Sequence, residues 1–315
     1  MSSTNQEIMD KFATALPGLN FGEVIEVGAG YIVPLIDDPN VERDYISFEE
    51  ALNAKVLKFT DTGNINQVTI KNTGDKDVLI LAGQIVSSQG TQDRIFAETT
   101  FIMAHEKVTL TCNCCEASHP ISGGTKFNAS VVASPRNIKY CSIMTDVEHY
   151  QRQSKIWSKV DATRNKLKDQ GVYKSAKSTD KLEEIAKESK KTTKDLLNKA
   201  KLANNQRGIV VLNNDAKIVG VEIFDSPETY KNLHEKIIES YLEDFTDKPK
   251  PKPSGDLKSV LQNELKCLFT EKIKVDNKKD RSLFRNKDMA LNGEVVFSPS
   301  EKKKKRIVMF RAGME

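Results

Sequence analysis

The sequence predicts an α+β fold in which a strand-rich, antiparallel N-terminal half packs with long helices in the C-terminal half. Short alternating apolar runs separated by turn residues occupy the first 120 residues, as half-buried antiparallel strands do. Residues 145–170 and 178–205 lack proline and glycine and carry apolar side chains at helical spacing. A chain of 315 residues with 38% hydrophobic content can bury a core without disulfides or metals.

A lysine- and proline-rich run divides the chain near its C-terminal end. Residues 248–253 read KPKPKP, and this alternation favours an extended, semi-rigid spacer. We therefore expect a main α+β domain over residues 1–247, a Lys/Pro linker over 248–255, and a C-terminal extension of helix and strand over 256–315 that can pack on the main domain.

Turn and cap signals set the elements of the N-terminal part. A glycine turn at 28–30 between two apolar runs predicts a hairpin. Ser47 precedes Glu50 by three residues, which is the spacing of a capping box, so a short helix is expected to begin there. The expected elements are a helix within residues 1–16, strands over 21–27 and 31–36, the helix after Ser47, and strands over 56–59 and 67–71.

The stretch 78–120 combines apolar runs, a polar turn and a cysteine cluster. Four apolar residues at 78–81 fit a buried strand. Residues 87–94 are all polar or glycine, and strand-like composition returns at 96–103 and 108–114. Because a polar loop held between strands is a common geometry of binding sites, we expect the functional site here.

Helix and strand signals continue after the two long helical segments. Ser226 before Pro227 and Glu228 is a strong helix start, with a capping oxygen, a first-turn proline and an acidic residue. The buried face of that helix is expected to comprise Tyr230, Leu233, Ile237, Ile238 and Tyr241. The other expected elements are a hairpin of strands 208–213 and 217–224, a helix within 257–268, and strands at 282–284, 294–297 and 307–310.

Four residues of the polar loop are the best candidates for ligand contact: Gln89, Gln92, Asp93 and Arg94. An arginine can hold a phosphate or carboxylate with two donors, and amides of a glycine turn can help to hold an anion. The alternative is that Asp93 and Arg94 neutralise each other and only fix the loop.

A cysteine cluster raises the question of a metal site. Thiolates and imidazole are preferred zinc ligands, so Cys112, Cys114 and His119 are candidates, with Glu116 nearby. Strand alternation, however, places Cys115 on the face opposite Cys112 and Cys114. We therefore expect buried free thiols and no cofactor, with a zinc site or a reactive thiol as alternatives.

The sequence lacks the strong catalytic and targeting signatures. It contains no GxGxxG, GxxxxGK[ST], HExxH or GxSxG motif, so enzymatic activity is not indicated. The net charge of +4 is small and nucleic acid is not an expected partner; the basic run 302–306 is expected to be a solvated turn. No apolar run approaches the roughly 18 residues of a membrane span, so we expect a soluble, cytoplasmic protein.

Several short motifs follow one another along the chain in a fixed order. They are Tyr45–Leu52 (YISFEEAL), Leu79–Gly83 (LILAG), Gln92-Asp93-Arg94, Cys114-Cys115-Glu116, Val219–Thr229 (VGVEIFDSPET) and Ser240-Tyr241. This order resembles an uncharacterised prokaryotic family, which is named for its genomic association with ADP-ribosylglycohydrolases and rhodanese-type phosphatases. The resemblance implies a link to ADP-ribose or nucleotide metabolism. Where the family has D-G-E-E, this chain has Ala82-Gly83-Gln84-Ile85, and the site positions that carry over are Gly83, Gln92, Arg94, Cys114 and Glu116.

Together these observations predict binding of a small anionic or nucleotide-like ligand, related to ADP-ribose, at the polar loop. One alternative is a metal-assisted hydrolase that uses Cys112, Cys114, Glu116 and His119. The other is a scaffold that binds an acidic partner or nucleic acid through its lysine-rich segments.

Overall fold

A computed structural model describes much of the chain in two compact units. Unit 1 comprises Met1–Val41, Lys194–His234 and Tyr241–Glu315, and unit 2 comprises Glu42–Thr193 and Glu235–Ser240. Most of the predicted linker and most of the predicted helix at 1–16 lie outside the described residues. The described residues are 7, 10, 20–37, 41–87, 92–115, 124, 126–127, 129–144, 147–173, 181–248, 261, 273–278, 281–286, 290–299 and 306–314.

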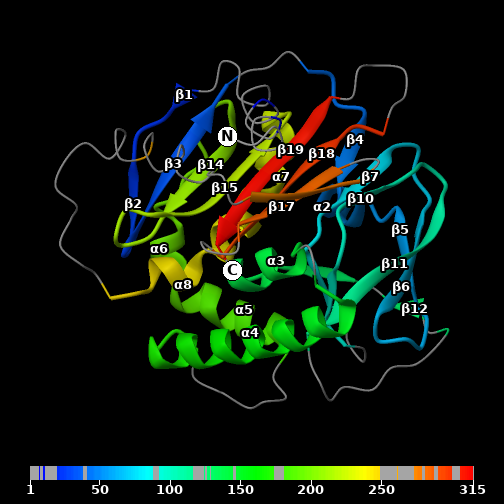
Figure 1. Ribbon diagram of the computed structural model, residues 1–315, viewed down its shortest axis with the longest axis horizontal. Helices are drawn as coiled ribbons and strands as arrows, with labels where there is room; N and C mark the ends of the chain where they lie inside the picture. The colour runs from blue at the N-terminus through cyan, green and yellow to red at the C-terminus, as the bar shows by residue number, and fades with distance from the viewer. Residues whose placement is uncertain are drawn as a thin grey trace. The chain divides into compact units, whose positions relative to one another are not determined.

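Unit 1 is built on a nine-stranded sheet in which every pairing is antiparallel. The sheet order is β1-β3-β14-β15-β19-β18-β17-β16, with β2 paired to β3, so the chain's first and last strands share one sheet (Figure 1). The strands are β1 Asn20–Phe21, β2 Ile25–Val27, β3 Gly30–Ile36, β14 Gln206–Leu212, β15 Ile218–Phe224, β16 Ile273–Asn277, β17 Arg281–Asn286, β18 Leu291–Phe297 and β19 Ile307–Met314.

Unit 1 also contains α6 (Lys194–Leu197), α8 (Leu242–Phe245) and the first part of α7 (Pro227–Ser240). The Ser226 hydroxyl accepts a hydrogen bond from the Glu228 N–H, which confirms the predicted helix start. The predicted buried face of α7 is also confirmed, since Tyr230, Leu233, Ile237, Ile238 and Tyr241 are all at most 5% exposed.

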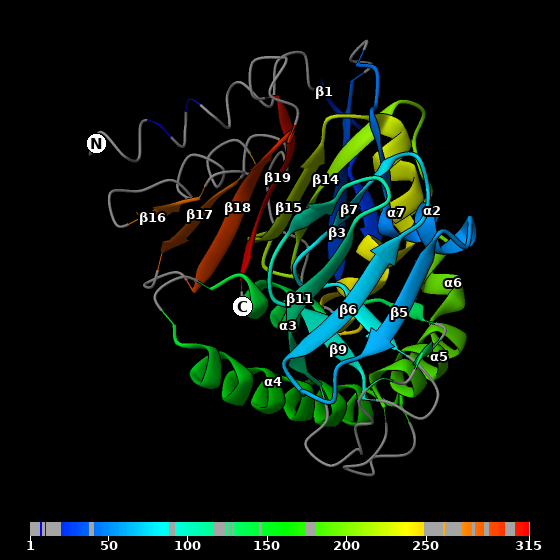
Figure 2. The same ribbon diagram turned by 90° about the vertical axis from the view of Figure 1, so that its right-hand side faces the viewer.

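Unit 2 contains a seven-stranded sheet and a three-stranded sheet. The larger has the order β12-β5-β6-β11-β9-β8-β13, and β5, β6, β11 and β9 can be followed side by side in Figure 2. In the smaller sheet, β10-β7-β4, the β4–β7 pairing is parallel. The strands are β4 Tyr45–Ser47, β5 Leu57–Asp61, β6 Gln67–Asn72, β7 Asp77–Ile80, β8 Ile85–Ser87, β9 Arg94–Phe96, β10 Thr100–Ile102, β11 Lys107–Cys114, β12 Lys126–Phe127 and β13 Ser130–Val132.

An aromatic core joins α2 (Phe48–Asn53) to the larger sheet of unit 2. The rings of Phe59 and Phe96 both meet Phe48 edge-on, with centroids 6.1 and 5.5 Å away. The predicted capping box is confirmed, because Ser47 and Glu50 each bind the other's backbone N–H. The helices of unit 2 are α2 Phe48–Asn53, α3 Arg136–Ser142, α4 His149–Asp169, α5 Leu182–Thr192 and the last part of α7.

The predicted fold class is wrong, because long helices do not make up the C-terminal half. After α6 the described chain forms six strands, β14 to β19. The helical pattern at 178–205 is interrupted at Thr192 and Thr193, whose hydroxyls bind the carbonyls four residues earlier. β-Branched side chains that bond to the backbone weaken a helix, so α5 stops there. Strands such as β17 (RSLFRN) carry arginines and so gave a weak strand signal.

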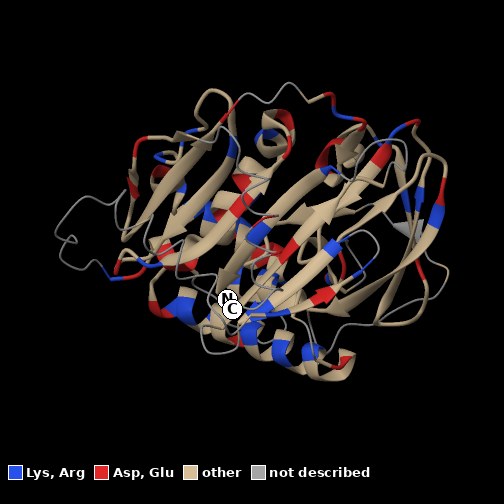
Figure 3. Cartoon of the chain, turned by 45° about the horizontal axis from the view of Figure 1, so that its top comes forward, with Lys and Arg blue, Asp and Glu red and all other residues tan. Residues whose placement is uncertain are grey.

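Basic and acidic segments alternate along the strands and helices (Figure 3), in keeping with the near balance of Lys+Arg 48 and Asp+Glu 44. Of the basic run 302–306 only Arg306 is described, and it forms an ion pair with Asp225 at 3.2 Å. Among the helices that the structure describes, none has the length and apolar character needed to span a bilayer.

Candidate functional site

The larger sheet of unit 2 brings two of the predicted ligand residues together. Strands β9 and β11 pair antiparallel, with Arg94 directly opposite Cys114. Gln89, Glu116 and His119 lie outside the described residues. Gly83, Gln92, Asp93, Arg94 and Cys114 are described.

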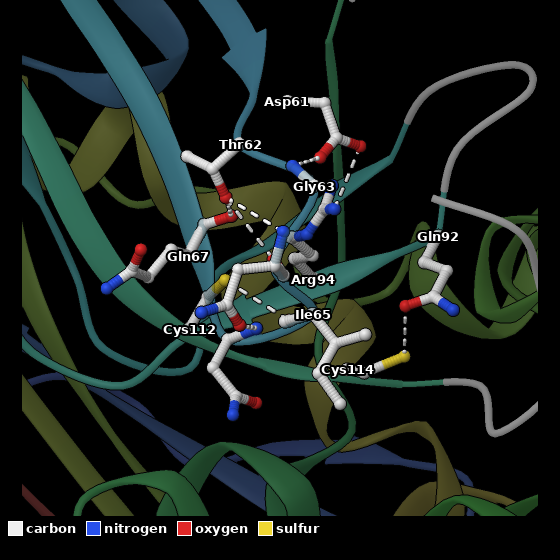
Figure 4. Close-up of polar contacts among 11 residues, drawn as sticks. Asp61, Thr62, Gly63, Ile65, Gln67, Gln92, Arg94, Cys112 and Cys114 are labelled. Atoms are coloured by element: carbon white, nitrogen blue, oxygen red, sulfur yellow. Dashed lines mark hydrogen bonds and ion pairs between the residues drawn. The ribbon is translucent and has the colours of Figure 1, made fainter. Parts of the chain in front are cut away.

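Arg94 forms an ion pair with Asp61 at the end of β5. Its Nη2 lies 2.9 Å from Asp61 Oδ2, and the two side chains are 1% and 0% exposed (Figure 4). Asp61 also accepts a hydrogen bond from the Gly63 N–H at 2.9 Å. Because a buried guanidinium and carboxylate neutralise each other, the charge of Arg94 is already compensated by Asp61, although Arg94 Nε has no hydrogen-bond partner among the described residues.

Asp93 faces a different partner. Its carboxylate lies 3.7 Å from Lys181 Nζ and accepts a hydrogen bond of 3.3 Å from the Glu183 N–H at the start of α5. Asp93 is 0% exposed. The two neighbouring charges of the predicted site therefore bind two different elements, Arg94 to β5 and Asp93 to the start of α5.

Cys114 is held by side chains from two directions. Its thiol donates to Gln92 Oε1 at 2.9 Å (Figure 4). Gln153 of α4 accepts from the Cys114 N–H at 2.8 Å and donates to the Cys114 carbonyl at 2.7 Å. We refer to Asp61, Gln92, Arg94 and Cys114 as the Arg94 cluster; all four are at most 5% exposed.

The cysteines of this region are buried free thiols. Burial raises the pKa of Cys112 to about 12, although the Arg94 charge acts in the opposite direction. A thiol with so high a pKa is a poor nucleophile and a poor metal ligand at neutral pH. In the part of the chain that the structure describes, no three His, Cys, Asp or Glu side chains are grouped so as to hold a metal ion.

A second polar cluster of unit 2 was missed by the sequence analysis. Gln84, in the turn between β7 and β8, donates from Nε2 to Glu49 Oε1 at 2.8 Å. On α3, Lys139 donates to the Ser240 hydroxyl of α7 at 2.9 Å. Lys236, one turn before Ser240, is near enough for its charge to act on Glu49. We refer to Glu49, Gln84, Lys139, Lys236 and Ser240 as the Glu49 cluster.

Gly83 joins the two hydrogen-bonded pairs of the Glu49 cluster. Its φ of +83° is one that other residues rarely adopt, and a Cβ there would lie 3.0 Å from the Lys139 backbone. Lys139 therefore packs directly against the residue before Gln84. Gly83 sets the close approach of this turn to α3, and its part in ligand binding stays a prediction.

Glu49 carries an unusual carboxyl group. Burial raises its pKa to about 7, against the lowering effects of its own backbone N–H, the Gln84 amide and Lys236. Oε2 is buried and has no hydrogen-bond partner among the described residues. At the other side of the cluster, Lys236 forms an ion pair of 3.2 Å with Glu239, and its side chain is 32% exposed.

Little in the sequence could have indicated Glu49. It follows a clear helix start at Ser47, where acidic residues are common for reasons of helix stability alone. Its partner Gln84 is 35 positions away along the chain. Glu49 falls within residues 45–52, which carry the family resemblance, whereas Gln84 follows Leu79–Gly83 at a position where this chain differs from the family.

Comparison with known proteins gives one match. The model of the ARG and Rhodanese-Phosphatase-superfamily-associated Protein domain matches residues 18–310. No curated protein and no solved structure matches the chain.

Proposed function

Because this chain belongs to the family of ARG and Rhodanese-Phosphatase-superfamily-associated Proteins, we propose that it binds a small anionic, nucleotide-like ligand at the Glu49 cluster. The family is associated with ADP-ribosylglycohydrolases and rhodanese-type phosphatases, so ADP-ribose and related compounds are the first ligands to test. Association with these enzymes indicates a class of ligand but not a binding site. The support for the site comes from the chemistry of the Glu49 cluster.

The observation that carries the proposal is the set of polar groups in the Glu49 cluster: the Gln84 amide is bonded to Glu49, the Lys236 charge acts on Glu49, and the Lys139–Ser240 pair packs against Gly83, the neighbour of Gln84. Lys139 and Lys236 supply positive charge, while the Gln84 amide and the Ser240 hydroxyl supply neutral hydrogen-bonding groups. Ligand sites are typically built from a few such polar groups set in a mostly apolar fold. Lys236 is 32% exposed, so an approaching ligand meets this cation first.

The Arg94 cluster supports the same function less well. Its guanidinium is 1% exposed and is already bound to a carboxylate, so an anion that displaced Asp61 would leave that carboxylate buried and unpaired. The cost of an uncompensated buried charge is several kcal/mol, on the order of the whole binding energy of a weak ligand. An anion that binds Lys236 does not meet this cost. Glu239, the ion-pair partner of Lys236, is also paired with Lys190 and so keeps a cation.

Titration calorimetry with ADP-ribose, ADP and inorganic phosphate tests the proposal. We expect Lys236→Met to weaken binding at least about tenfold, because a charge-assisted contact is lost. Lys231→Met is the matched control, since Lys231 is an exposed lysine on the same helix and outside the cluster. Wild-type protein that binds none of the three compounds would remove the proposal.

A separate experiment tests which of the two clusters binds the ligand. The double variant Asp61→Leu/Arg94→Met removes both charges of the buried pair together and leaves neither one unpaired. We expect it to bind the ligand as the wild type does. Loss of binding in this folded variant, with normal binding by Lys236→Met, would move the site to the Arg94 cluster.

A further inference from the structure

The orientation of one amide fixes how Glu49 can use its two oxygens. Gln84 Oε1 accepts a hydrogen bond from the Leu81 N–H at 2.7 Å, so its Nε2 must be the atom that faces Glu49. An amide N–H can only donate, and Glu49 Oε1 therefore acts as the acceptor whether the carboxyl is ionised or neutral. With Oε1 bound to the Gln84 amide, Oε2 is the oxygen from which the neutral acid can donate its proton to a further partner.

Oε2 is the atom left for another partner. It is buried and lacks a hydrogen-bond partner within the described residues, and a buried polar atom in that state costs free energy. An ionised Oε2 needs a donor, whereas a protonated Oε2 needs an acceptor. Burial raises the pKa of this carboxyl to about 7, so the protonated form is populated at neutral pH.

The charged groups around Glu49 are engaged elsewhere. On α2, Glu50 receives two hydrogen bonds of 2.6 Å from Arg43. On α7, Lys236 is paired with Glu239, which also faces Lys190 of α5 at 2.9 Å. On α3, Lys139 donates to Ser240.

From this geometry, we propose that Glu49 acts in ligand binding as a neutral carboxylic acid, donating a hydrogen bond from Oε2 to an anionic oxygen of the ligand. The inference rests on the proposed function of the same cluster. An O–H···O⁻ hydrogen bond is short and strong, whereas an ionised Glu49 would repel the same oxygen. Binding therefore takes up a proton whenever the free protein carries Glu49 ionised, and affinity falls as the pH rises above neutrality.

Titration of ADP-ribose from about pH 6 to pH 9 tests the inference, because the diphosphate of this probe does not itself titrate in that range. For the wild type we expect the dissociation constant to rise about tenfold per pH unit above the pKa of Glu49, with uptake of up to about one proton in calorimetry across buffers of different ionisation enthalpy. Glu49→Gln keeps an acceptor for Gln84 and a donor for the ligand, so its affinity should be independent of pH.

The controls separate this inference from the proposed function. Glu50→Gln, one residue along the same helix, should keep the pH dependence of the wild type. Wild-type binding without pH dependence, or the same dependence in Glu49→Gln, overturns the role of Glu49 and leaves the ligand site standing. Absence of wild-type binding even at about pH 6 overturns both.

Discussion

In the Arg94 cluster, the guanidinium and its Asp61 partner are 1% and 0% exposed and neutralise each other, whereas in the Glu49 cluster Lys236 keeps 32% of its side chain exposed. Both clusters lie in unit 2 and join segments distant in the chain. Their difference shows that burial alone does not mark a functional group. Arg94 is the more deeply buried and its charge is compensated by Asp61, whereas Glu49 forms no ion pair within the described residues; each group has one atom, Arg94 Nε and Glu49 Oε2, that those residues leave without a hydrogen bond.

The two clusters also use burial in opposite ways. A buried ion pair keeps both groups charged, and each partner depends on the other. Within the described residues no cation forms an ion pair with the Glu49 carboxyl, so burial favours its neutral form. The first arrangement fixes structure, and the second leaves a group able to exchange a proton near neutral pH.

The largest expected effect comes from breaking the Arg94 cluster. Asp61→Ala leaves the Arg94 guanidinium buried without its partner, and we expect the free energy of unfolding to fall by about 3–5 kcal/mol. Urea denaturation measures this loss. The double variant Asp61→Leu/Arg94→Met should recover most of it, and a loss below about 1 kcal/mol in Asp61→Ala would show that the pair does not support the fold.

The next effect concerns the pH dependence of stability. The pKa of Glu49 is higher in the folded than in the unfolded state. The stability that Glu49 contributes to the fold is therefore fully present below about pH 4.5 and is lost as the pH rises through about 7. The free energy of unfolding of the wild type, relative to Glu49→Gln, should fall by up to about 3 kcal/mol over that range. Chemical denaturation at a series of pH values measures the difference.

Glu50→Gln is the control, because Glu50 should affect the pH dependence of stability in the opposite direction to Glu49. Burial raises the pKa of Glu50, but its hydrogen bonds from Arg43 and from the Ser47 N–H bring it below the ordinary value. Its contribution is therefore present above about pH 4.5 and is lost as the pH falls. If both variants showed the same pH profile relative to wild type, the distinct state assigned to Glu49 would be refuted.

A smaller effect is expected at Gly83, which contacts elements of both clusters. Its N–H donates to the Phe96 carbonyl of β9 at 2.8 Å, and it packs against Lys139. Gly83→Ala should lower the free energy of unfolding by about 2 kcal/mol, from the strained backbone and the contact with the Lys139 backbone. Gly171→Ala is the matched control, because its φ is +70° and nothing lies within 4 Å of the added Cβ. Thermal denaturation should give the control the smaller loss; equal losses would mean that the contact with Lys139 adds nothing.

Sequence patterns between neighbouring residues predicted the local structure correctly, whereas contacts between residues far apart in the chain could not be predicted from the sequence. The capping box at Ser47 and the start of α7 depend on residues three or fewer positions apart, and both are confirmed. Three C-terminal strands, β17, β18 and β19, were also expected, whereas β16 was not. Their place beside β15 depends on the pairing of β19 with β15, about 90 positions earlier. The helical pattern at 178–205 was misleading because two consecutive threonines interrupt it.

The candidate site also depends on contacts between residues far apart in the chain, which the sequence could not predict. Arg94 and Cys114 could be named from composition, but their burial follows from Asp61 and from Gln153, which are 33 and 39 positions away. Nothing near Arg94 in sequence shows which carboxylate binds it. Glu49 shows the converse, since an ordinary position in a helix start becomes unusual only through the turn that carries Gln84.

The smallest effect on stability, and the sharpest separation of the two clusters, is expected from Lys236→Met. Lys236 is partly exposed and its pair with Glu239 is one of two contacts that hold that carboxylate, so we expect a change in unfolding free energy of less than about 0.5 kcal/mol. Ligand affinity should nevertheless fall at least about tenfold. A stability loss as large as that of Asp61→Ala would place Lys236 among the structural residues, because a group held for binding contributes little to the folded state by itself.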